Sequence, residues 1–86
     1  MTILQLKYAV TAADESSMRK ASEKLFVSQP GLSDSIKKLE SELGFKIFKR
    51  MHDGVTLTGE GSTFISYARK LVKQFEELEE QFSIRP

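Results

Sequence analysis

One stretch of the sequence, SQPGLSDSIKKLESELG at residues 28–44, predicts a single short helix with one buried edge. Ser28 is a good N-cap, and Pro30 falls in the first turn, where its missing N–H costs nothing. Gly44 is the residue type that most often ends a helix in the left-handed conformation. Between these ends, apolar residues recur at spacings of four, three and four, at Leu32, Ile36, Leu39 and Leu43. This narrow stripe predicts a helix that packs along one side and presents a polar face on the other.

Two shorter helices are expected before this one and a longer helix after it. Thr2 can cap the first helix, with Gln5 in the capping-box position, and apolar residues spaced by three and four carry that helix to about Asp14. Ser17 can cap a second, short helix whose inward positions are Met18, Ala21 and Leu25. Thr58 can cap the long last helix.

The segment between the third and the last helix has the pattern of a hairpin. FKIFKR at residues 45–50 alternates as a strand does, MHDG at 51–54 is typical of a turn, and VTLT follows as a second short strand. The sequence thus predicts a mainly α fold: a winged helix-turn-helix, with a three-helix core and a two-stranded wing at about residues 46–57, followed by a long helix. We expect residues 1–57 to form the winged unit and residues 58–86 a linker helix.

Charge and composition narrow the possible functions. The net charge is only +1, but residues 18–50 hold eight basic and four acidic side chains, which suits a nucleic-acid contact surface. The chain has no cysteine, and therefore no disulfide framework or thiolate site. No apolar run reaches the roughly 20 residues that span a bilayer, and the start does not have the pattern of a signal peptide. We therefore expect a cytoplasmic protein with no membrane contact.

Three motifs, in this order and spacing, resemble the N-terminal DNA-binding region of LysR-type transcriptional regulators. They are LQLKYAV in the first helix, KASEKLFVSQPGLSDSIKKLESELGFKIFKR through the helix-turn-helix and first wing strand, and GVTLTGEG before the last helix. The resemblance covers essentially the whole chain. It implies sequence-specific binding of double-stranded DNA, with the third helix, at about residues 28–43, in the major groove and the wing on the minor groove or backbone.

The resemblance also implies partners beyond DNA. Family members act as homodimers or as tetramers of paired dimers, held together by the last helix. A C-terminal effector domain, absent from this chain, would bind a small-molecule effector, so no cofactor or metal is expected here.

The residues expected to contact DNA lie on the outer side of the third helix and in the wing. Ser28, Gln29 and Pro30 match the start of the family's recognition helix: Ser28 can cap, and Gln29 can pair with an adenine edge or a phosphate. A hydroxyl and ammonium groups on the outer face suit phosphates or base acceptors. In the wing, Arg50 is the best candidate for the minor groove or backbone. The full predicted set is Ser28, Gln29, Pro30, Ser33, Asp34, Lys37, Lys38, Lys49, Arg50 and His52.

Two positions depart from the family pattern. Asp34 stands where relatives usually carry arginine or another long donor, and an aspartate repels phosphate and cannot pair with a guanine acceptor edge. Asp34 could accept from a cytosine amino group, orient Lys38 four residues later, or weaken binding; we favour the second interpretation. The wing turn has His52 and no arginine, which predicts weaker minor-groove readout and a solvated or phosphate-contacting histidine.

The last helix repeats apolar residues with gaps of four and three, which is typical of a coiled-coil seam. Such a helix is longer than a three-helix core can cover, so an exposed stripe on it would need a partner. The predicted dimerisation residues are Phe64, Ala68, Leu71, Phe75, Leu78 and Phe82.

A protein-interaction module and an enzyme are the alternatives to DNA binding. A winged helix can serve only as a protein-interaction module, and Asp34 and Asp53 would favour that. The cations at Lys37, Lys38, Lys49 and Arg50 argue against it, because an interaction module has no need for four on one surface. An enzyme is not expected, because the sequence offers no nucleophile–base pair and no ligand cluster.

Overall fold

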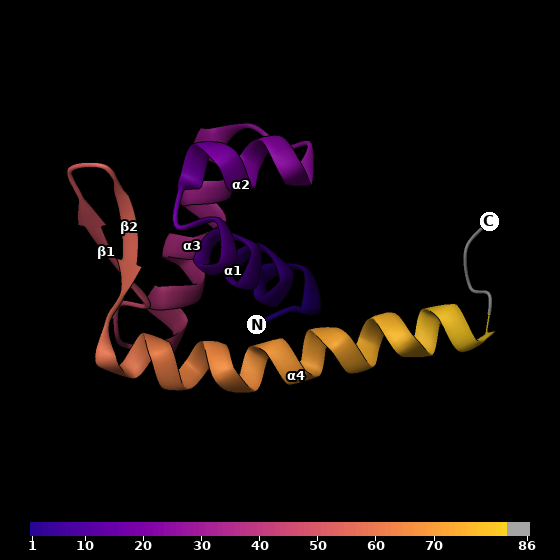
Figure 1. The fold of residues 1–86 in the computed structure, drawn as a ribbon. Helices are drawn as coiled ribbons and strands as arrows, with labels where there is room; N and C mark the ends of the chain where they lie inside the picture. The colour runs from indigo at the N-terminus through magenta and orange to yellow at the C-terminus, as the bar shows by residue number, and fades with distance from the viewer. Residues whose placement is uncertain (83–86) are drawn as a thin grey trace.

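The computed structural model describes residues 1–82 and contains four helices and one two-stranded sheet (Figure 1). The order along the chain is α1 (Ile3–Glu15), α2 (Met18–Leu25), α3 (Gln29–Leu43), β1 (Phe48–Met51), β2 (Gly54–Leu57) and α4 (Gly59–Phe82). The predicted fold, a winged helix-turn-helix followed by a long helix, is confirmed.

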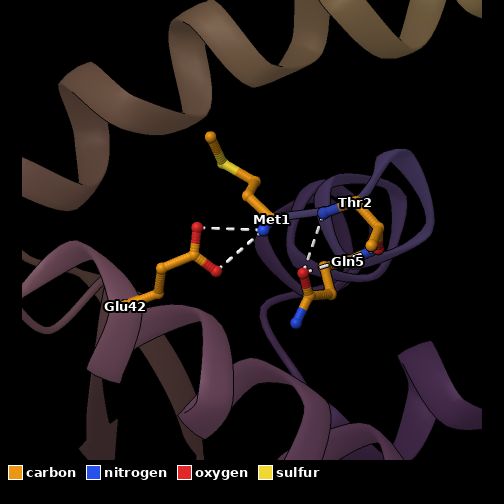
Figure 2. Close-up of polar contacts among 4 residues, drawn as sticks. All are labelled: Met1, Thr2, Gln5 and Glu42. Carbon is orange, nitrogen blue, oxygen red and sulfur yellow. Dashed lines mark hydrogen bonds and ion pairs between the residues drawn. The ribbon is translucent and has the colours of Figure 1, made fainter.

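Short polar side chains start the helices as the sequence predicted. At α1 the Thr2 hydroxyl accepts from the Gln5 N–H at 3.1 Å, and the Gln5 side chain accepts from the Thr2 N–H at 2.9 Å (Figure 2). Ser17 and Ser28 cap α2 and α3 through one bond each, in which the serine hydroxyl accepts from the N–H of Lys20 or Gly31. The Met1 amino group donates to both carboxylate oxygens of Glu42, at 2.7 and 2.9 Å, and so joins the start of α1 to the end of α3 (Figure 2).

Left-handed residues end the first three helices. Gly44 ends α3 with a φ of 82°, as expected, and Ser16 ends α1 with a φ of 52°. Phe26 ends α2 with a φ of 59°, and its side chain is 94% exposed. A bulky side chain is unfavourable in this conformation, which costs on the order of 1–3 kcal/mol.

The hydrophobic core lies where α1 crosses the other helices. Ala9, Ala12, Ala21, Leu32 and Leu39 are completely buried there. The first half of α4 belongs to the same core through Ile65, Ala68 and Val72. Two ion pairs fix α1 along α4, Asp14–Arg69 at 2.6 Å and Lys7–Glu76 at 3.7 Å. The expected division after residue 57 thus falls between two elements, β2 and α4, but the residues on both sides of it share one hydrophobic core.

The wing is an antiparallel hairpin in which Phe48 pairs with Leu57 and Met51 with Gly54. The first strand starts later than the alternation at residues 45–50 predicted. The Ile47 N–H donates to the Glu40 carboxylate, so the next pair in the register, Ile47 with Thr58, keeps only the bond from the Thr58 N–H to the Ile47 carbonyl. The strands also extend further into the MHDG segment, so the turn itself is only His52 and Asp53.

A backbone contact ties the wing to the connection between α1 and α2. The Val55 N–H donates to the Ser16 carbonyl at 3.1 Å. Gly54, with a φ of 152°, approaches that carbonyl so closely that a Cβ there would collide with it. Only glycine fits at this position.

The last helix extends beyond the globular part (Figure 1). The Thr58 hydroxyl accepts from the Gly61 N–H at 2.8 Å, which confirms the predicted cap, and Glu60 lies in the first turn. No helix among residues 1–82 is both long and apolar enough to cross a membrane.

Candidate nucleic-acid interface

Helix α3 buries one face and leaves the predicted contact residues on the other. Leu32, Ile36 and Leu39 are at most 3% exposed. At the N-terminus, the Ser28 hydroxyl accepts from the Gly31 N–H at 3.0 Å, so this side chain is used within the helix. Gln29 and Pro30 are exposed beside it. Gln29 therefore presents an exposed amide at this end of α3.

A hydrogen bond between two side chains joins the wing to α3. The guanidinium Nη2 of Arg50 donates to the Ser33 hydroxyl at 3.0 Å, which turns Arg50 toward α3. A shallow depression beside this contact is lined by residues of three elements, including Arg19 of α2, Gln29 of α3 and Arg50 of the wing. The fold thus brings together residues that lie up to 31 positions apart in the sequence.

Arg19 was not among the predicted site residues. The sequence showed it only as one of several basic residues, and its partner within α2 is Glu23 at 3.0 Å. Its position beside Gln29 depends on how α2 packs against α3, which local patterns do not reveal.

Asp34 and Lys38 form the ion pair that the sequence suggested. Lys38 Nζ lies 3.2 Å from Asp34 Oδ2, and both side chains are well exposed, at 72% and 65%. The geometry supports the interpretation that Asp34 orients Lys38. A carboxylate oxygen that faces solvent also remains able to accept from a cytosine amino group.

The other predicted cations are exposed and differ in their partners. Among residues 1–82, Lys37 and Lys49 have no carboxylate partner within ion-pair distance. His52 is exposed in the wing turn, and the described residues contain no cluster of three side chains suited to a metal. Lys37, Lys49 and Arg50 are therefore available to a polyanion without breaking an ion pair.

The apolar stripe of α4 divides into a buried and an exposed part. Ala68 lies in the core of its own domain, where it is 2% exposed, and Phe64 packs edge-on against Phe45 at 6.2 Å between ring centroids. The exposed part is the outer seam, which we define as Leu71, Phe75, Leu78 and Phe82. These side chains are 38% to 69% exposed.

Comparison with known proteins shows to which family this chain belongs. The model of the lysR family of bacterial regulatory helix-turn-helix proteins matches residues 3–62. The chain belongs to this family. The match spans the helix-turn-helix, the wing and the start of α4, so the LysR-family resemblance that the sequence suggested is confirmed.

Relatives and solved structures agree with the assignment. The chain is 44% identical over 78 residues to the uncharacterized HTH-type transcriptional regulator YcgK of Bacillus subtilis, covering 91% of this chain and 24% of that protein. Full-length OxyR from Pseudomonas aeruginosa, in a variant form, superposes with a TM-score of 0.89 at 40% identity, covering 98% of this chain and 28% of the other. The DNA-binding domain of BenM, a regulator of Acinetobacter baylyi, in complex with catB site 1 DNA gives a TM-score of 0.90 at 36% identity. That superposition covers 96% of this chain and 93% of the BenM chain.

The chain spans about a quarter of the length of the curated LysR-family relatives it matches. It corresponds to their winged helix-turn-helix and the helix that follows.

Proposed function

We propose that this LysR-family domain binds double-stranded DNA sequence-specifically, with α3 in the major groove and the wing on the adjacent backbone or minor groove. The observation that carries the proposal is the outer face of α3, where Gln29 is exposed. Lys37 has no carboxylate partner among residues 1–82 and lines the same depression as Arg50 of the wing. The major groove of B-DNA is wide enough to admit one α-helix. Lysine and arginine side chains that have no carboxylate partner can contact the phosphates beside it. The likeness to a domain solved on DNA supports the same docking.

The proposed unit is a homodimer held by the outer seam of α4, in a transcription regulator that works in the cytoplasm and has no catalytic role. In this proposal the domain itself needs no cofactor, and a small-molecule effector acts through a further C-terminal domain, which allows tetramers of paired dimers. Two observations support a regulator with a further domain: relatives are named as transcriptional regulators, and this chain spans only 24% of their length.

A salt-dependent DNA mobility shift tests the proposal, and two variants separate its two kinds of contact. Lys37→Ala should weaken binding about equally on selected and mixed-sequence duplexes and lower the salt slope by about one unit, because it removes one phosphate contact. Gln29→Ala should instead lose about 1–3 kcal/mol of discrimination at particular base pairs. A pure interaction module would give no shift with any duplex at low salt, and that result would end the proposal.

The unusual aspartate gives a second prediction. Asp34→Ala should leave base preference unchanged and alter affinity only modestly, since an exposed i,i+4 pair contributes about 0.2–0.5 kcal/mol. Asp34→Arg should raise affinity for mixed-sequence DNA, because the local charge changes from negative to positive near phosphates. Binding-site selection from a randomised duplex library measures both. Relaxed preference at one base pair in Asp34→Ala would favour cytosine readout, and a lower mixed-sequence affinity in Asp34→Arg would place residue 34 away from DNA.

A further inference from the structure

A buried carboxylate lies between the recognition helix and the wing. Glu40, near the end of α3, is 8% exposed. Its Oε2 accepts from the Ile47 N–H at 2.7 Å and from the Phe48 N–H at 3.2 Å, and its Oε1 lies 4.0 Å from Lys46 Nζ. Burying a carboxylate is costly unless hydrogen bonds compensate it, and here two backbone donors of the chain entering β1 do so.

The segment held by Glu40 is also held from its other side. The Thr58 hydroxyl donates to the Lys46 carbonyl at 2.6 Å, and the Thr58 N–H donates to the Ile47 carbonyl at 3.0 Å. Ile47 itself is completely buried. The chain entering β1 is therefore fixed by α3 through its N–H groups and by the start of α4 through its carbonyls.

The position of Arg50 depends on this attachment. Phe48 and Arg50 are two residues apart on one strand, so their side chains point to the same side. Phe48 is buried against the helical core, and Arg50 reaches Ser33 of α3. Glu40 and Ser33 lie on the same helix, two turns apart, and so contact the start and the middle of the same strand.

We propose that Glu40 is a positioning residue for DNA binding, which fixes β1 against α3 so that Arg50 stands beside the recognition face. This inference rests on the proposed function. The positioning role and the charge of Glu40 predict opposite changes in DNA affinity when this carboxylate is neutralised. A carboxylate near DNA repels phosphates, so its neutralisation should raise affinity if charge were its only effect, whereas loss of positioning should lower affinity.

The test compares Glu40→Gln with Glu42→Gln, on a mixed-sequence duplex long enough for two half-sites. Glu42 is on the same helix, but its carboxylate is exposed and contacts only the Met1 amino group among residues 1–82, so Glu42→Gln reports the charge effect. Glu40→Gln should lower affinity by about three- to tenfold, as expected for one weakened charge-assisted contact, while circular dichroism shows an intact fold. Glu42→Gln should leave affinity equal or slightly higher.

Combining each variant with Arg50→Ala shows whether Glu40 acts through the wing. In the Arg50→Ala background, Glu40→Gln should cause no further loss, because the contact it positions is already gone. Equal losses in both backgrounds, or a rise like that of Glu42→Gln, would overturn the proposal. If the parent chain does not bind the duplex, it is the proposed function that fails.

Amide hydrogen exchange provides a measurement that does not depend on DNA. Glu40→Gln should speed exchange at the Ile47 and Phe48 amides while those of Leu32 and Ile36 stay protected. Unchanged exchange at Ile47 and Phe48 would overturn the positioning role. Should Glu40→Gln unfold the chain, Ser33→Ala cuts the other end of the same link. Ser33→Ala should lower DNA affinity in the parent chain but not in the Arg50→Ala background. If the losses from Ser33→Ala and Arg50→Ala added in the double variant, the proposal would be contradicted.

Discussion

Leu71→Glu combined with Leu78→Glu should dissociate the dimer and lower affinity for a two-half-site operator by about 10²–10⁴-fold. Both leucines are about half exposed on α4 and neither lies in the buried core, so the change acts on the outer seam. Each buried leucine contributes about 1.5–3 kcal/mol, twice in a homodimer, and glutamates add like charges across the interface. Without the dimer, two half-site contacts become independent events and lose the gain from effective concentration.

Lys73→Glu is the matched control for this double variant. It changes the charge of each chain by the same amount, on an exposed position of α4 that lies away from the outer seam. Light scattering and circular dichroism should show a folded monomer for the double variant and a dimer for the control. A dimeric double variant that binds the operator as tightly as the parent would place the interface elsewhere.

Gly61→Ala should destabilise the domain more than any exposed substitution. Gly61 is buried in the first turns of α4, and a Cβ there would overlap the backbone carbonyl of Ile47. Backbone cannot move aside as a flexible side chain can, so α4 must shift away from the segment that it holds. Overpacking of this kind costs about 1–3 kcal/mol, which lowers Tm by about 4–8 °C for each kcal/mol in a domain of this size.

Gly59→Ala provides the comparison for that measurement. Gly59 lies two residues earlier in the same helix, and a Cβ there would meet nothing within 4 Å. Its replacement should leave Tm unchanged or slightly higher, because alanine favours helix more than glycine does. If the two variants melted at the same temperature, the close approach of Gly61 to Ile47 would be wrong.

Features of the fold that depend on near neighbours were predictable from the sequence. The caps at Thr2, Ser17 and Ser28 and the left-handed Gly44 involve residues within a few positions of one another. The Asp34–Lys38 pair is four residues apart on one helix, and its ion pair is present. In each case helix geometry alone brings the groups together.

Features that depend on packing were not predictable. The alternation at residues 45–50 predicts one strand, but the strand starts only at Phe48, and the buried Glu40 takes the Ile47 N–H that would otherwise extend the ladder. The periodicity of α4 places Ala68 in a seam, while in the structure Ala68 is buried in the core of its own domain. The Ser33–Arg50 hydrogen bond and the place of Arg19 likewise require knowledge of which elements meet.

The bond between Val55 and Ser16 has a consequence for the order in which the molecule folds. It joins the second wing strand to the turn that follows α1, and α2, α3 and β1 lie in the long loop between its partners. Closing such a loop costs chain entropy before any contact compensates for it. The pairing within the wing is local, so it is the docking of the wing on this turn that we expect to form late, and we expect its loss to speed unfolding more than it slows folding.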